Sequence, residues 1–230
     1  DYYYGAVWTT WDKDLAERNS AALSRVSVQL KDEIEFYKFI QFKFFEQWEK
    51  LRKYVNSKKI EIIGDIPIYM GYDSVDVWAG QKEFQLDENL KPINVAGCPP
   101  DAFSDWGQKW GNPIYDWDEM ERCDFAWWKK RMIASAKLYD VTRIDHFIGI
   151  VRYYNIPVDG VPKDGFFAKG PGIKLINAID SVMGDAKVIA EDLGVVVPEV
   201  TELIKKSGYP GMKILQFAFD GNTNNEHAPH

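Results

Sequence analysis

The sequence has 230 residues, a hydrophobic content of 46%, a formal net charge of −7 and a pI near 5.1. It is long enough to bury a substantial core, and its composition is that of an ordinary soluble domain. The negative charge disfavours nucleic acid or an anionic membrane as a partner, because both attract basic surfaces. No apolar run approaches the roughly 20 residues that a membrane-spanning helix needs.

Aromatic residues make up 15% of the chain, with 9 Trp and 12 Tyr. Flat aromatic rings are common platforms for sugars, but we expect most of these rings to form an aromatic core. The two cysteines, Cys98 and Cys123, lie in no Cys–Cys or Cys–His cluster, so no zinc site is expected. Isolated cysteines are typical of reduced thiols in a cytoplasm, and a plastid protein fits equally well if the source is a plant. The first residue is Asp rather than Met, which suggests a piece of a longer protein.

The first half of the chain predicts one long helix, one strand and one long loop. Apolar residues recur every three or four positions over 31–56, and additional phenylalanines predict a helix covered on more than one side. The β-branched run 59–69 reads as a buried strand that closes on Gly64 and Asp65. Residues 70–118 lack clear periodicity and are rich in Gly, Pro, Asp and Trp, which predicts a long active-site loop or subdomain.

The second half alternates helices with apolar strands. Helices are predicted at 119–138, 173–183 and 198–206, and strands at 141–147, 187–191 and 212–219. This alternation is typical of an α/β protein with a parallel sheet, either open or closed into a barrel. A closed (β/α)8 barrel has eight strands, so four strands would be about half of one.

Three of the four predicted strands end in a carboxylate: Asp65, Asp145 and Glu191. The carboxyl ends of parallel strands open on one face, so these side chains should converge and could bind a cation, transfer protons or cleave a glycosidic bond. A retaining glycosidase holds two carboxyl groups about 5 Å apart, which neighbouring strands about 4.8 Å apart can supply. Arg143 shares a strand face with Asp145 and would keep it ionised. The same spacing also fits an Asp–Arg pair that only orients the strand ends.

Six segments resemble the 4-α-glucanotransferases, or amylomaltases, of glycoside hydrolase family 77. The resemblance runs along nearly the whole chain, and the segments occur in the order of the family. They are Gly64-Asp-Ile-Pro-Ile-Tyr69, Gly97-Cys-Pro-Pro-Asp-Ala-Phe-Ser104, Gly107-Gln-Lys-Trp-Gly-Asn-Pro-Ile-Tyr-Asp-Trp117, Arg143-Ile-Asp-His-Phe147, Glu191-Asp-Leu-Gly194 and Pro210-Gly-Met-Lys-Ile-Leu-Gln-Phe-Ala-Phe219.

The resemblance implies a TIM-type (β/α)8 barrel, of which residues 1–230 form the central part of the catalytic domain, about strands 3 to 6 with the long loop 70–118 inserted. It implies transfer of α-1,4-glucan segments by retaining double displacement, with Asp145 as nucleophile and Glu191 as acid/base, and with no cofactor or metal. The sugar-binding residues that it implies are Asp65, Asp101, Gln108, Trp110, Arg143 and Phe217.

The sequence also departs from the family pattern. The family has a third carboxylate in a Thr-His-Asp-Asn segment, which does not occur in this sequence, and its N-terminal strands have no counterpart here. We therefore expect little or no transferase activity from these residues alone. A half-barrel would expose apolar edges, which predicts self-association.

Three other functions compete with this interpretation. An α-amylase-type hydrolase would share the barrel and its carboxylates. A non-catalytic protein could bind α-1,4-glucans and maltooligosaccharides without turning them over. A metal-dependent α/β enzyme could use the same carboxylates on Mg²⁺.

Overall fold

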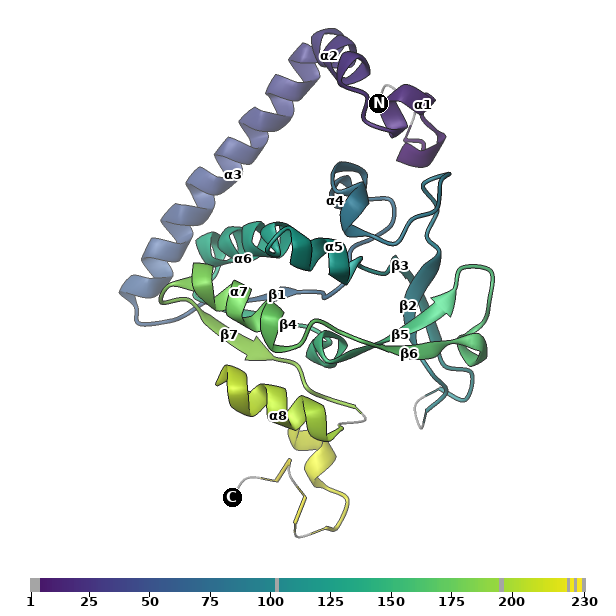
Figure 1. The fold of residues 1–230 in the computed structure, drawn as a ribbon. Coiled ribbons are helices and arrows are strands. Elements are labelled where there is room, and N and C mark those ends of the chain that lie inside the picture. Colours follow the sequence, from purple (N-terminus) through teal and green to yellow (C-terminus); the bar gives the residue numbers. More distant parts are fainter. Residues whose placement is uncertain (1–4, 102–103, 195–196, 223, 226, 229–230) are drawn as a thin grey trace.

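The computed structural model describes residues 5–101, 104–194, 197–222, 224–225 and 227–228, and Figure 1 shows them as an α/β body flanked by one long helix. The α-helices are α1 Lys13–Ala16, α2 Ser20–Gln29, α3 Lys31–Ser57, α4 Val75–Ala79, α5 Trp117–Arg122, α6 Ala126–Leu138, α7 Ile173–Met183 and α8 Pro198–Ser207. The strands are β1 Ile63–Ile66, β2 Asn94–Cys98, β3 Gln108–Pro113, β4 Val141–Ile144, β5 Arg152–Pro157, β6 Phe166–Lys169 and β7 Lys187–Ala190. Short 3-10 turns cover Trp8–Thr10, Gln81–Glu83, Phe147–Ile150, Pro162–Asp164 and Leu215–Ala218.

A parallel three-stranded sheet with the order β1-β4-β7 lies at the centre of the body. The three strands end in step, because Ile66 pairs with Ile144, which pairs in turn with Ala190. The ladder continues past the strands, since the Asp145 N–H donates to the carbonyl of Ile66 and the Glu191 N–H donates to that of Ile144. The residues that follow β4 and β7 are therefore fixed side by side at one edge of the sheet.

An antiparallel sheet with the order β3-β2-β5-β6 lies beside this edge (Figure 1). Its strands carry Gly, Pro and Asn, and one pairing contains an irregularity between Val95 and Gly97. These features hide the alternation that normally identifies a strand. The segment 70–118, predicted as a long active-site loop or subdomain, contains α4, β2 and β3. The boundaries of that segment as a unit stay a prediction.

The main core forms between the parallel sheet and helices α6 and α7. Its fully buried side chains include Trp128 and Met132 of α6, Ile176 and Ile179 of α7, and Ile144 of β4. Most tryptophans and tyrosines near α5 and α6 pack on one another, so the prediction of an aromatic core is confirmed for them. Helix α7 has the bounds expected from the sequence, whereas the helix predicted at 119–138 is broken into α5 and α6 by left-handed residues Asp124 and Phe125.

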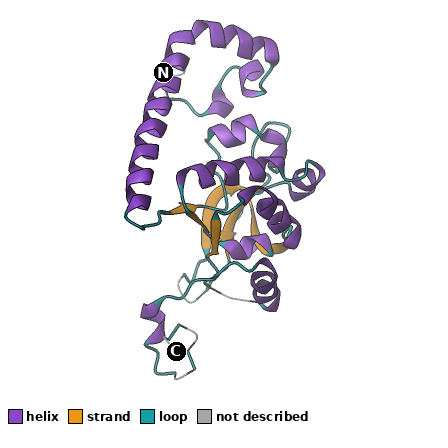
Figure 2. Cartoon of the chain, turned by 90° about the vertical axis from the view of Figure 1, so that its left-hand side faces the viewer, coloured by secondary structure: helices purple, strands orange, loops and turns teal. Residues whose placement is uncertain are grey.

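Helix α3 runs along one side of the body, and anchors lie in α1 (Lys13–Ala16), which precedes it, and near its own C-terminal end (Figures 1 and 2). The N-terminal segment docks on the α4 region, where the indole N–H of Trp78 donates to the carbonyl of Leu15. Near the end of α3, the indole N–H of Trp48 donates to the carbonyl of Leu138. No described residue of α3 is buried, so the prediction of a helix covered on several sides is wrong for this structure.

The prediction of a fourth strand at 212–219 is also wrong. The segment is irregular and then forms the turn Leu215–Ala218, and Phe219 is 80% exposed. A strand is stabilised by a series of backbone hydrogen bonds to a neighbouring strand. The Ala190 N–H of β7 does donate to the carbonyl of Pro210, but Pro210 lies before the segment begins. The sequence pattern indicated an apolar extended segment without indicating a neighbour for it.

Candidate active site

Arg143 joins two carboxylates from adjacent strands at the edge of the parallel sheet. It lies opposite Asp65 in the β1–β4 register and two residues before Asp145. One terminal nitrogen, Nη1, lies 2.6 Å from Asp65 Oδ1, and the other, Nη2, lies 2.8 Å from Asp145 Oδ1. The third donor, Nε, lies 3.2 Å from the sulfur of Met212. The planar fork of the guanidinium thus orients both carboxylates.

Glu191 follows β7 and is 8% exposed, which makes it the most deeply buried of the three strand-end carboxylates. Its Oε2 accepts the backbone N–H of His146 at 2.7 Å, and its Oε1 accepts that of Leu193 at 2.9 Å. Burial raises the pKa of Glu191, and the negative charge of Asp145 raises it further; the two N–H donors and Arg143 act in the opposite direction. The net shift is upward, as a proton donor near neutral pH requires.

An aromatic wall lies next to these carboxylates. The ring of His146 meets that of Trp110 edge-on, with centroids 5.0 Å apart, and Tyr69 lies 6.3 Å from His146. The indole N–H of Trp110 donates to the side-chain oxygen of Gln108 at 3.0 Å, which orients both side chains. Trp110 is 38% exposed, so part of its face is open to a ligand. Burial lowers the pKa of His146 to about 4 against the opposing charge of Asp145, and the ring is therefore neutral at pH 7.

The remaining two sequence-predicted residues, Asp101 and Phe217, make contacts of their own within their loop and the C-terminal segment. Asp101 closes its own turn, because its Oδ1 accepts the Ser104 N–H at 2.8 Å. Phe217 is 45% exposed, and its ring packs edge-on against His227 in the C-terminal segment. Their roles at a sugar site stay predictions.

Sequence reasoning missed three contributors to the site. The backbone N–H groups of His146 and Leu193 hold Glu191, and the sulfur of Met212 contacts Arg143. Backbone donors have no residue-type signature, and the left-handed conformation of His146, with φ of 55°, is not visible in a single sequence. Within the described ranges, no three or more His, Cys, Asp or Glu side chains form a group that could hold a metal ion. None of the described helices is both long enough and apolar enough to cross a membrane.

The sequence profile of glycoside hydrolase family 77, described as 4-alpha-glucanotransferase, matches residues 1–230. The chain belongs to glycoside hydrolase family 77. Family 77 relatives include the 4-alpha-glucanotransferases of Clostridium butyricum, 47% identical over 225 residues, and of Thermus thermophilus, 44% identical over 227 residues. These alignments cover 97% and 98% of this chain but 46% and 45% of the relatives. The chain thus spans about half the length of the curated family 77 proteins that it matches.

Solved structures agree with this family 77 assignment. The amylomaltase from Streptococcus agalactiae in complex with acarbose is 40% identical, with a TM-score of 0.92, and the match covers 98% of this chain and 46% of that chain. The amylomaltase from Corynebacterium glutamicum is 19% identical, with a TM-score of 0.74 over 98% of this chain and 32% of that one, and shows similarity of fold alone. The mixed α/β architecture with partial sheets is thus that of the corresponding part of a family 77 enzyme.

Proposed function

We propose that this chain carries the nucleophile and the acid/base of a 4-α-glucanotransferase, with Asp145 and Glu191 in those roles. The observation that carries the proposal is the contrast between the two carboxyl groups. Asp145 forms an ion pair with Arg143 and is 44% exposed, whereas Glu191 is buried and burial raises its pKa. Two carboxyl groups with opposed environments at one strand edge are what retaining glycosyl transfer requires.

In the first step, a carboxylate oxygen of Asp145 attacks the anomeric carbon of a glucan donor. The bond to the glycosidic oxygen breaks as Glu191 transfers its proton to that oxygen, and the leaving chain departs with a new 4-hydroxyl. The product is a glucan esterified to Asp145. Each of the two displacements inverts the anomeric carbon, so the complete reaction retains its configuration.

In the second step, Glu191 changes from acid to base. Esterification removes the charge of Asp145, which had raised the pKa of Glu191, so that pKa falls and the carboxylate form is favoured. Glu191 then accepts the proton of an incoming 4-hydroxyl as its oxygen attacks the anomeric carbon and releases Asp145. When the acceptor is the 4-hydroxyl of a glucan or of glucose, glucan segments are redistributed without net hydrolysis.

We further propose that the aromatic wall and the surrounding polar groups bind the sugar units nearest the cut. The exposed face of Trp110 offers a stacking surface, and the amide of Gln108 can donate to and accept from hydroxyls. Asp65 and Arg143 lie at the same edge. Asp101 and Phe217 are included in the same proposed set of sugar-binding residues, and membership of family 77 supports including them. The substrates are α-1,4-glucans and maltooligosaccharides, which agrees with a relative whose structure contains acarbose.

The architecture proposed for the whole enzyme is a (β/α)8 barrel in which β1, β4 and β7 are consecutive strands. Residues 1–230 then form the central part of the catalytic domain, with 70–118 as a subdomain beside its mouth. Within the described residues β1 and β7 are the edge strands of this sheet, where further strands or a second copy could pair. The free thiols of Cys98 and Cys123 agree with a reducing compartment such as the cytoplasm or a plastid stroma.

The test compares the 230-residue chain with a chimera in which it replaces the matching segment of the Clostridium butyricum relative. With maltotriose, the chimera should give a ladder of longer and shorter maltooligosaccharides, and the chain alone should give little. Short hydrolysis products without a ladder would indicate an amylase-type hydrolase instead. Quenching of tryptophan fluorescence by maltooligosaccharide with no turnover in either protein would indicate a binding protein.

The two roles are separated with azide as an external nucleophile and α-maltosyl fluoride as donor. The chimera carrying Asp145→Ala should yield a glycosyl azide of inverted configuration, because azide replaces the enzyme nucleophile. The chimera carrying Glu191→Ala should yield a glycosyl azide of retained configuration, because Asp145 still forms the intermediate. The exposed Asp159 provides a matched control, and Asp159→Ala should leave the product ladder unchanged.

A further inference from the structure

The turn after β4 holds Glu191 by both its side chain and its backbone. The His146 N–H donates to Glu191 Oε2 at 2.7 Å, and the next N–H, that of Phe147, donates to the Glu191 carbonyl at 2.9 Å. Two consecutive amides can reach the carboxylate and the carbonyl of the same residue because His146 adopts a left-handed conformation, with φ of 55° and ψ of 46°. The position of the Glu191 carboxyl group thus depends on a backbone conformation one residue beyond Asp145.

A left-handed conformation is costly for a residue with a β-carbon, so other contacts have to maintain it. The imidazole of His146 supplies them, because it packs edge-on against Trp110 and beside Tyr69. The ring also lies close to the turn that follows it, since a β-carbon added at Gly149 would lie 3.1 Å from the ring and 2.8 Å from Ile68. The ring is therefore confined between the aromatic wall and the turn Phe147–Ile150.

We propose that His146 is a positioning residue: its ring locks the turn that aims the 146 N–H at Glu191, and so it couples the Trp110 wall to the acid/base. Histidine at this position then acts through shape and backbone geometry rather than by proton transfer. A sugar that stacks on Trp110 acts on the His146 ring, which packs against Trp110 and fixes the Glu191 carboxyl group. Substrate binding and proton transfer are therefore coupled. The coupling rests on the proposed function, whereas the local geometry does not.

The test measures the pKa of Glu191 directly in the 230-residue chain, by carbon-13 NMR of glutamate carboxyl groups with Glu191→Gln for assignment. His146→Gly and His146→Asn both tolerate the left-handed conformation but remove the ring. Each should raise the Glu191 pKa by about one unit, because a donor that favours the carboxylate is no longer held in place. His146→Phe keeps a ring of similar width and should shift this pKa by less than half as much.

A double-mutant cycle tests the coupling to Trp110. In the native background, Trp110→Ala should raise the Glu191 pKa in the same direction as His146→Gly, since the ring of His146 loses its support. In the His146→Gly background, Trp110→Ala should have no further effect. Lys59 is a matched control because it is also left-handed, with φ of 61°, but lies at the opposite end of β1. Lys59→Gly should leave the pKa of Glu191 unchanged.

Native-like circular dichroism is required of every variant in the comparison, and His146→Asn serves if His146→Gly does not fold. A Glu191 pKa that stays the same in the folded Gly and Asn variants would overturn the proposal, as would additive effects of Trp110→Ala and His146→Gly. If the pKa shifts as expected but the chimera with the Clostridium butyricum relative shows no product ladder, the proposed function fails and the positioning role stands. If the ladder is present and the pKa does not move, only the positioning role fails.

Discussion

Arg143 is the residue on which the charge balance of the site depends. It forms ion pairs with Asp65 and Asp145, and both contacts are at least partly exposed to solvent. Their contribution to stability is therefore small, and their main effect is to orient Asp145. Lysine could not replace arginine in this role, because its single nitrogen cannot hold carboxylates from two strands in fixed directions as the planar guanidinium does.

We predict that Arg143→Lys lowers kcat for maltotriose disproportionation by about 100-fold, since one nitrogen is unable to hold both carboxylates in line. Thermal stability should change little, because the ion pairs are solvent-screened. The measurement is steady-state kinetics together with a melting curve on the chimera. Activity within threefold of the unsubstituted protein would mean that Arg143 does not orient the nucleophile.

The charge of Asp145 should affect the pKa of Glu191. Because Asp145 raises the pKa of Glu191, Asp145→Asn should lower that pKa, and the carbon-13 titration of Glu191 measures it without any need for activity. The kcat/KM of the active enzyme should fall on the alkaline side as pH rises through the raised pKa of Glu191, since the first step needs its proton. An unchanged pKa of Glu191 in Asp145→Asn would show that the two carboxyl groups do not interact electrostatically.

The sequence allowed the strand-end residues to be predicted, because an acidic residue after an apolar run is a local pattern. Asp145, Arg143 and Glu191 are indeed brought to one edge by the register of β4 and β7. The backbone donors to Glu191 escaped prediction, because they depend on the conformation of His146 and on contacts with β3, nearly forty residues earlier. Only the folded chain brings those segments together.

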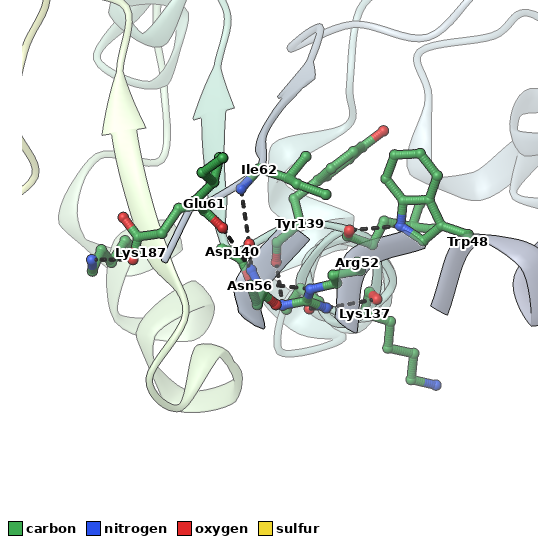
Figure 3. A network of polar contacts seen from close by, with 12 residues as sticks. Trp48, Arg52, Asn56, Glu61, Ile62, Lys137, Tyr139, Asp140 and Lys187 are labelled. Carbon is green, nitrogen blue, oxygen red and sulfur yellow. Dashed lines mark hydrogen bonds and ion pairs between the residues drawn. The ribbon is translucent and has the colours of Figure 1, made fainter. Parts of the chain in front are cut away.

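At the scale of secondary-structure elements, one polar network fixes the base of the parallel sheet (Figure 3). The Arg52 guanidinium of α3 donates to Asp140 Oδ1 and to the carbonyl oxygens of three residues at the end of α6 and just after it. Asp140 Oδ2 accepts from Asn56 and from the Ile62 N–H. Burial opposes ionisation of Asp140, but these donors outweigh it and lower its pKa. The end of α3 and the residues that lead into β1 and β4 are thereby held together.

Arg52→Met should destabilise the fold by about 3 kcal/mol at pH 7, because Asp140 loses its cation while it is largely removed from solvent. The stabilisation from Asp140 is present above its unfolded pKa of about 3.9 and is lost as pH falls through the lower folded value. The difference in the free energy of unfolding between the native protein and Arg52→Met, measured in urea, should therefore become smaller at acidic pH. Lys53→Met removes an exposed pair with Glu49 and should cost less than about 1 kcal/mol. Equal losses from both substitutions would contradict this account.

Elements with strong local periodicity matched their predictions, and those that depend on partners did not. Helix α7 and strand β7 follow from spacing and β-branched content. The antiparallel strands β2, β3, β5 and β6 were missed because each draws its stability from a neighbour distant in sequence rather than from its own pattern. The segment 212–219 shows the converse, since its pattern suits a strand but no partner strand pairs with it in the described chain.

At the scale of the whole molecule, α3 carries an exposed aromatic stripe. Phe36, Ile40 and Phe44 lie on one side of the helix at four-residue spacing and are 59%, 40% and 51% exposed. A stripe of this kind on a free surface favours contact with another apolar surface.

The 230-residue chain should therefore self-associate at micromolar concentration, and light scattering should give an apparent mass above 26.5 kDa. Replacing Phe36, Ile40 and Phe44 with Gln should lower the apparent mass towards that of one chain while leaving the helical signal intact. The matched control replaces three exposed apolar residues elsewhere, Val28, Ile93 and Leu215, with Gln. A mass that falls only with the control set would show that association uses a different surface.

The two anchors of α3 also determine the order in which the chain can fold. The helix itself needs only contacts between residues four apart, whereas the bonds of α1, which precedes it, join residues 63 to 65 apart and those at the C-terminal end of α3 join residues 84 to 90 apart. Closing such long loops is entropically slow, while a helix forms within about a microsecond. In refolding, the α3 helix should thus precede burial of Trp8 and assembly of the Arg52 network. Until its anchors close, this early helix presents its aromatic stripe to every other unfolded chain, and high protein concentration should divert refolding towards aggregation.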